Sequence, residues 1–238
     1  MTHPPTGPHG HTSFSRSVRR TGSRATVLSG CCLTLHLALS GAVAAQVGGG
    51  ESAEEATALS VARAFDERLT IWQAPDGRRT YASHCRSAPA GCRARIALYA
   101  RLIARISRAE DVDPFLVAAV VLRESGLNPF AEGSVGERGI VQLHPRGAGA
   151  DVEFVQSERY RRRCRSAADA CQEEVLRVGI QLLANSIRRC GSVEAGLGMY
   201  NGGTCQATSY SRRVLTERSR LLELAKRGAP QGESQTSR

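Results

Sequence analysis

The sequence predicts an all-α, disulfide-stapled domain, and three observations favour this fold class. Aromatic residues make up only 5% of the chain while glycine is frequent, which argues against a large β-sandwich with aromatic strands. Apolar residues recur at helical spacing in several separate segments. Six cysteines follow the first 45 residues, an even count that is typical of a disulfide framework in an oxidising compartment. The length suits one compact domain with short extensions.

The first 45 residues are predicted to be a secretory signal and an unstructured leader. Residues 1–24 are rich in Pro, Gly, Ser, Thr and His, and arginines precede an apolar run, Val27 to Ala45, that closes on small residues. This order is typical of a cleaved export signal, and its polar interruptions disfavour a membrane span. Leu28 to Cys31 resembles a lipobox, but few apolar residues precede it. We therefore expect an exported protein of the periplasm or cell envelope, rather than a lipoprotein anchored through Cys31.

The charge of the chain is positive. The formal net charge is +10, and removing four leader arginines from the 32 basic residues leaves 28 against 22 acidic ones, a net +6. Such a surplus suits an anionic polymer such as a cell wall. The basic residues are scattered and are not interleaved with aromatics, which favours a solvated surface over a nucleic-acid platform. We expect a monomer with no nucleic-acid partner and no stable membrane insertion.

Two helices with an intervening loop are predicted in the first part of the domain. Residues 46–52 have the composition of a linker, residues 53–70 have helical periodicity, and residues 73–90 read as a loop held by one disulfide. The next helix has an apolar face that consists of Ile96, Tyr99, Leu102, Ile103 and Ile106. Its other faces carry Arg93, Arg95, Arg101, Arg105 and Arg108. Such an arginine stripe predicts a solvated surface.

The segment from residue 113 to residue 148 combines a buried helix with a glycine-rich loop. Asp113 followed by Pro114 predicts an N-cap and first turn, and residues 115–122 are apolar on every side, which predicts a buried helix. Gly126 is the predicted C-cap of this helix. Residues 127–148 are too rich in glycine for a long helix, so a loop with a short apolar turn is predicted there. Further helices are predicted over 167–189, from the cap Ser192 to Tyr200, and over 210–226.

The sequence alone leaves the pairing of the cysteines open. The simplest pairing joins neighbours, namely Cys85 with Cys92, Cys164 with Cys171, and Cys190 with Cys205. A zinc site is the alternative, but no CxxC pair or suitably spaced histidine supports it. We expect no metal ion and no organic cofactor.

Glu124 is the most informative residue, because it is an acid at the inner end of an otherwise apolar helix. Desolvation and the negative end of the helix dipole both predict a raised pKa, which would keep Glu124 protonated near neutral pH. Glycosidic cleavage needs such an acid, since the departing sugar oxygen must receive a proton. The alternative is that Glu124 only pairs with Arg123 or another arginine at a helix end.

Three ordered motifs carry a resemblance to a known family. They are Glu124-Ser125-Gly126-Leu127-Asn128-Pro129, Gly136-Glu137-Arg138-Gly139-Ile140-Val141-Gln142-Leu143-His144-Pro145 and Met199-Tyr200-Asn201-Gly202-Gly203. Together they resemble the soluble lytic transglycosylase catalytic domain, related to goose-type lysozyme, over roughly residues 92–220. The resemblance implies a compact lysozyme-like helical fold. With it we expect a leader over 1–45, an extension with one helix over 46–91, a catalytic domain over 92–225 and a disordered tail over 226–238.

The resemblance also implies roles for individual residues. Glu124 would be the catalytic residue, Gln142 and Tyr200 would line the sugar cleft, and Asn201 would support the adjoining loop. Ser134 is the candidate cleft serine, although Gly133 stands where the family has that serine.

Two further residues of the motifs invite other interpretations. Glu137 replaces a small residue and could be the second carboxylate of a two-acid glycosidase, but its charged, glycine-flanked setting favours exposure or pairing with Arg138. For His144, a packed or solvent-facing loop histidine is favoured over a metal ligand.

The implied activity is cleavage of the bond between MurNAc and GlcNAc in peptidoglycan. Glu124 would protonate this bond, the acetamido group of the substrate would assist, and closure of a 1,6-anhydro ring would follow. Two alternatives remain open: a lysozyme-type hydrolase, and a catalytically silent wall-binding or assembly protein with the same fold.

Overall fold

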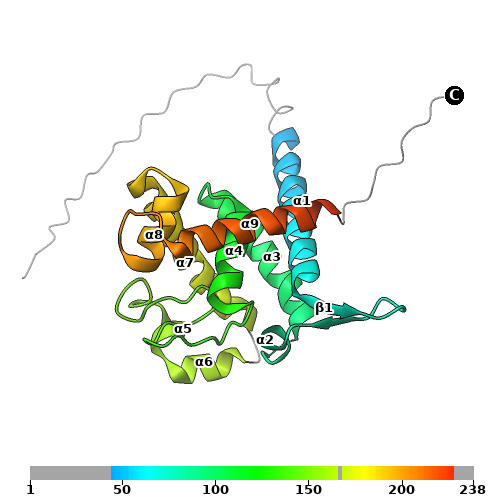
Figure 1. Ribbon diagram of the computed structural model, residues 1–238, viewed down its shortest axis with the longest axis horizontal. Helices are drawn as coiled ribbons and strands as arrows, with labels where there is room; N and C mark the ends of the chain where they lie inside the picture. The colour runs from blue at the N-terminus through cyan, green and yellow to red at the C-terminus, as the bar shows by residue number, and fades with distance from the viewer. Residues whose placement is uncertain (1–43, 90, 166–167, 228–238) are drawn as a thin grey trace, which may run out of the picture. The chain divides into compact units, whose positions relative to one another are not determined.

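The computed structural model describes residues 44–89, 91–165 and 168–227, and these residues form one largely helical unit (Figure 1). Its elements are α1 (Ala44–Leu69), β1 (Thr70–Gln73), β2 (Arg79–Tyr81), α2 (Ser83–Arg86), α3 (Cys92–Ala109), α4 (Pro114–Ser125), α5 (Glu153–Gln156), α6 (Glu158–Cys164), α7 (Ala168–Cys190), α8 (Val193–Gly202) and α9 (Ser209–Arg227). The predicted all-α class is confirmed. The predicted export signal lies almost wholly outside the described residues. None of the described helices has the length and apolarity that a membrane span requires.

Helix α4 lies in the centre of the core, as its apolar sequence predicts. Its residues from Leu116 to Val121 are all buried. Asp113 accepts a hydrogen bond from the backbone N–H of Phe115, and Gly126 ends the helix in the left-handed conformation with a φ of 59°. A Cβ atom at Gly126 would also lie 2.4 Å from Cδ2 of His84, so both backbone conformation and space require glycine there.

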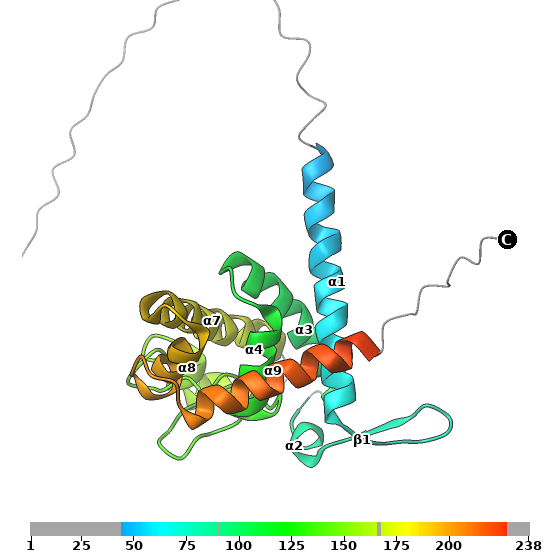
Figure 2. The ribbon, with the colours of Figure 1, turned by 45° about the horizontal axis from the view of Figure 1, so that its top comes forward.

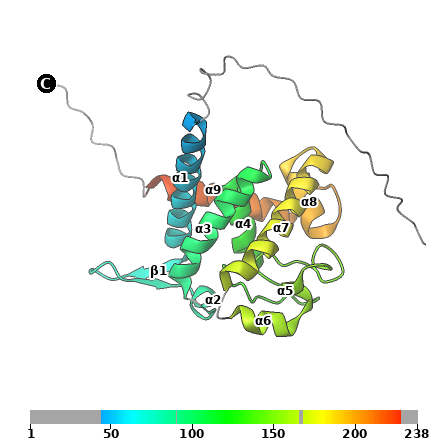
Figure 3. The same cartoon turned by 180° about the vertical axis from the view of Figure 1, so that it is seen from behind.

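Helices from both ends of the chain enclose α4. Helices α3 and α9 both pack against it, and α1 packs against both α3 and α9 (Figures 2 and 3). Helix α8 packs against α7 and α9. The predicted apolar face of α3 is buried, from Ile96 to Ile106. The first and last described helices, α1 and α9, thus pack around the helix that carries Glu124.

Two predictions for the N-terminal segment are wrong. The linker expected over 46–52 is part of α1, because a helix that is anchored by packing farther along extends at little cost toward its end. The loop expected over 73–90 contains strand β2, which pairs antiparallel with β1, and also helix α2. The turn between the strands holds Asp76, which accepts a hydrogen bond from the N–H of Arg78, and Gly77 with a φ of 83°. Asp-Gly is a dipeptide typical of hairpin turns, and the sequence does contain it at Asp76-Gly77.

Arg95 corrects the prediction of a solvated arginine stripe on α3. It is only 1% exposed, whereas Arg101 on the same helix is exposed. Its guanidinium donates to four backbone carbonyls: those of Leu127 at 3.0 Å, Ala88 at 2.8 Å, Pro89 at 2.6 Å, and Cys85. Arg95 therefore joins the loop around α2 to the end of α4.

All three predicted disulfides are formed. Cys85 is bonded to Cys92, Cys164 to Cys171, and Cys190 to Cys205. The first joins α2 to the start of α3, and the last joins the end of α7 to the segment after α8. The short helices α5 and α6, which the sequence analysis did not anticipate, lie between the glycine-rich loop and α7.

Candidate active site

A cleft of about 520 Å³ lies at the C-terminal end of α4, between α8 and the glycine-rich loop over residues 127–148. The five residues predicted for the site all line it: Glu124, Ser134, Gln142, Tyr200 and Asn201. Glu137 and His144 line it as well. Residues that are far apart in the sequence thus meet around one carboxyl group, while their individual roles remain predictions.

The carboxyl group of Glu124 is held in a largely desolvated position. Burial raises its pKa, and the negative charge of Glu137 raises it further, while a hydrogen bond from Tyr210 and the positive charge of Arg123 lower it. The net shift of the pKa is upward, in the predicted direction. In the described part of the chain no arginine forms an ion pair with Glu124, so pairing with Arg123 does not account for its position.

Two tyrosines flank the catalytic candidate. The hydroxyl of Tyr210, at the start of α9, donates a hydrogen bond to Oε1 of Glu124. The hydroxyl of Tyr200 donates to the carbonyl of Val141 at 2.8 Å. Burial raises the pKa of both hydroxyls, so both stay protonated and remain donors. Tyr210 was assigned no role from the sequence, which predicts only that a helix begins there.

Gln142 organises the glycine-rich loop from within. Its backbone is left-handed, with a φ of 50°. Its side-chain Nε2 donates to the carbonyls of Ala131 at 3.0 Å and Gly139 at 2.9 Å. The hydroxyl of Ser125 donates to the carbonyl of Ile140 at 2.8 Å, which ties the end of α4 to the same loop. The loop is therefore held in one conformation beside Glu124 by hydrogen bonds to its own backbone.

Glu137 lies in the cleft, and the prediction that it is exposed or paired with Arg138 is wrong. Its side chain is partly buried, its Oε2 accepts a hydrogen bond from the N–H of Val135 at 3.2 Å, and Arg138 instead pairs with Glu132. A Cβ atom at Gly133 would lie 2.2 Å from Oε2 of Glu137. Glycine at the usual position of the family serine thus leaves space for a second carboxylate.

The remaining predicted residues lie at the edge of the cleft. Ser134 and Asn201 are exposed. His144 is partly buried, and its Nδ1 accepts a hydrogen bond from the N–H of Arg146 at 3.1 Å. Across the described ranges, no cluster of three His, Cys, Asp or Glu side chains is arranged to hold a metal ion.

A buried helix that ends in a protonatable carboxyl group, facing an open cleft within a helical domain, is the arrangement expected of a lysozyme-like protein. The family described as the transglycosylase SLT domain matches residues 101–221, half of the chain, and the chain belongs to this family. Every residue that lines the cleft lies within the match. A search of curated proteins gave no match. Membership of the family supports a lytic-transglycosylase type of function that acts on peptidoglycan.

Proposed function

We propose that the protein is an exported lytic transglycosylase that cleaves the MurNAc–GlcNAc bond of peptidoglycan and leaves 1,6-anhydro-MurNAc ends. The observation that carries the proposal is the raised pKa of Glu124 in a cleft large enough for sugar residues. The three disulfides support export, because disulfides persist in oxidising compartments.

In the first step Glu124 acts as the general acid. Its proton passes to the oxygen that joins the two sugars, the bond from this oxygen to C1 of MurNAc breaks, and GlcNAc leaves with a free hydroxyl. As that bond breaks, the acetamido oxygen of MurNAc bonds to C1 and takes up the positive charge that develops there, so no protein nucleophile is needed. The hydrogen bond from Tyr210 to Oε1 leaves the other carboxyl oxygen of Glu124 for the substrate.

In the second step the ionised Glu124 acts as the general base. It takes the proton of the C6 hydroxyl of MurNAc, O6 bonds to C1, and the bond from the acetamido oxygen to C1 breaks. This closes the anhydro ring without water and restores the carboxylic acid. Tyr210 stabilises the ionised form between the two steps, since a phenol donates a stronger hydrogen bond to a carboxylate than to a neutral acid.

Glu137 favours a second candidate function, a lysozyme-type hydrolase. It adds a carboxylate to the cleft of Glu124, and such a group can orient a water molecule toward C1. Water would then take the place of the C6 hydroxyl, and the product would be a reducing MurNAc end.

The test is to incubate the oxidised protein without its leader, and its Glu124→Gln variant, with purified peptidoglycan and to identify the soluble fragments by mass spectrometry. Glu194→Gln is the matched control, because Glu194 is exposed and does not line the cleft. Anhydro ends from the wild type and the control but not from Glu124→Gln are expected. Reducing ends, heavier by one water, would establish the hydrolase. If neither the wild type nor the Glu124→Gln variant released fragments from peptidoglycan, a wall-binding function would be favoured instead.

A further inference from the structure

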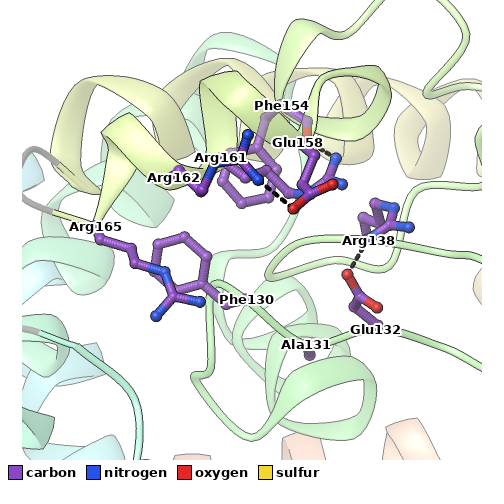
Figure 4. A pocket seen from close by; sticks show the side chains of 9 residues that line it. All are labelled: Phe130, Ala131, Glu132, Arg138, Phe154, Glu158, Arg161, Arg162 and Arg165. Carbon is purple, nitrogen blue, oxygen red and sulfur yellow. Dashed lines mark hydrogen bonds and ion pairs between the residues drawn. The ribbon is translucent and has the colours of Figure 1, made fainter.

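A second pocket, of about 400 Å³, adjoins the loop that borders the Glu124 cleft (Figure 4). Ala131, Glu132 and Arg138 of this loop line the second pocket, while Gly133 and Glu137 of the same loop line the cleft. The opposite wall comes from α6 and the residue that follows it. One short stretch of backbone therefore separates two concave sites.

The second pocket has a surplus of positive charge. Four arginines and two glutamates line it. Each glutamate already has an arginine partner, since Arg138 pairs with Glu132 and Arg162 pairs with Glu158. In the described ranges, neither Arg161 nor Arg165 forms an ion pair with a carboxylate, although the charge of Glu158 acts on Arg161.

The hydrogen bonds of Arg161 fix its side chain without neutralising it. Its Nη1 donates to the carbonyls of Phe154 at 3.0 Å and Val155 at 2.9 Å. Burial lowers the pKa of Arg161, and the positive charges of Arg138 and Arg162 lower it further, while the negative charge of Glu158 raises it. Like charges held together in this way raise the free energy of the empty pocket, and a bound anion would offset that cost.

The pocket also has an apolar wall. The partly buried ring of Phe130 forms this wall, with the fully buried ring of Phe154 behind it at 5.8 Å between centroids, and the guanidinium of Arg165 lies 5.7 Å from the centroid of the Phe130 ring. Planar guanidinium groups match the geometry of carboxylates, and the Phe130 ring suits a small aliphatic group. A short peptide with free carboxylates combines both properties.

We propose that this pocket binds the carboxylates of the peptide stems that peptidoglycan carries on its MurNAc residues, an inference that rests on the proposed function. A glycan strand held at Glu124 brings the stem of a MurNAc residue to the loop shared by the two sites. The arginines then bind the carboxylates, and strands that carry stems are cleaved in preference to strands without them.

The test compares glycan strands that carry stems with strands from which an amidase has removed them. Arg162→Gln and Arg165→Gln are combined in one variant, since both residues are exposed and lie outside the buried core. The control combines Arg159→Gln and Arg189→Gln, which removes the same charge from exposed residues outside the pocket. The pocket variant should lose about tenfold in kcat/KM on strands with stems, as for a lost charge-assisted hydrogen bond, and nothing on bare strands. An equal loss on both strands, or no loss, would overturn the proposal.

A binding experiment separates this proposal from the proposed function. The free stem peptide is titrated by calorimetry into the Glu124→Gln protein with and without the two pocket substitutions. Binding that the pocket substitutions weaken supports the site even where no fragment is released from peptidoglycan by the wild type. Binding that is equal in both proteins, or equally tight for a peptide with amidated carboxyl groups, would contradict it.

Discussion

Arg95 and Glu124 are two ionisable side chains withdrawn from water, yet the structure surrounds them in opposite ways. The guanidinium of Arg95 donates to four backbone carbonyls and is enclosed by protein. The carboxyl group of Glu124, by contrast, accepts a hydrogen bond from Tyr210 and faces a cleft. A buried polar group whose hydrogen-bonding atoms are all paired within the protein stabilises the fold, whereas one that keeps an atom open to a cleft can react with a substrate.

The same physical cause shifts both pKa values, with different results. Burial lowers the pKa of Arg95 and raises that of Glu124, because it disfavours the charged form of each. An arginine remains charged at any physiological pH, so the shift changes nothing in its chemistry. A glutamate with a raised pKa can exchange a proton near neutral pH. Burial therefore gives a reactive group only at Glu124.

The largest expected effect is on stability at the Arg95 site. Arg95→Met leaves three buried carbonyls and one partly buried carbonyl without their donor, and we expect the free energy of unfolding to fall by about 3–5 kcal/mol. Urea denaturation followed by circular dichroism measures it. Arg101→Met is the control, since Arg101 is exposed on the same helix and should change stability by less than about 0.5 kcal/mol. Similar losses for both variants would show that burial of Arg95 contributes nothing.

A smaller effect is expected at the wall of the cleft. The disulfide between Cys190 and Cys205 closes a loop with a sequence separation of 15 that contains Tyr200, and its loss should cost about 3 kcal/mol. Thermal unfolding of the Cys190→Ser/Cys205→Ser protein measures this. Activity should fall at temperatures where the protein is still folded, because α8 loses its anchor. Unchanged activity at those temperatures would mean that α7 and α9 hold this wall without the disulfide.

The surroundings of Arg95 and Glu124 also show which features the sequence could predict and which it could not. Caps and periodicity are local, so Asp113, Gly126, Ser192 and the apolar face of α3 were predicted correctly. The burial of Arg95 depends on a loop that approaches from outside its helix, which periodicity cannot indicate. The hydrogen bond from Tyr210 to Glu124 joins residues 86 positions apart, so no local pattern indicates it. Glu137 was misjudged because its position depends on the space left by Gly133.

Tyr210→Phe tests the hydrogen bond that Glu124 accepts from Tyr210. The ionised form of Glu124 loses a donor, so kcat/KM should fall by about tenfold, equivalent to about 1.4 kcal/mol, with little change in stability. The hydrogen bond from Tyr210 lowers the pKa of Glu124, so its removal should also move the pH profile of activity upward. Tyr160→Phe is the control, because Tyr160 does not line the cleft. A fall in activity without a shift in pH profile would contradict the assigned contact.

The smallest expected effect is the dependence of stability on pH at Glu124. The unfolded chain releases this proton near the ordinary pKa of 4.5, while the folded protein retains it to higher pH. Between the two pKa values the folded state binds more protons, so the free energy of unfolding of the wild type falls as pH rises through this window. Glutamine does not titrate, so the stability of Glu124→Gln relative to the wild type should increase across the window and then stay constant. Urea denaturation of both proteins from pH 4 to about pH 8 measures the difference.

Glu137→Gln sharpens the same measurement. The negative charge of Glu137 raises the pKa of Glu124, so its removal brings the folded pKa closer to the unfolded one and narrows the window. Tyr210 and Arg123, which act in the opposite direction, are left in place. A window unchanged by Glu137→Gln would mean that burial alone holds the proton on Glu124. A stability difference that shrinks as pH rises would instead mean that the folded protein favours the carboxylate, and Glu124 would then start the reaction without the proton that the departing sugar requires.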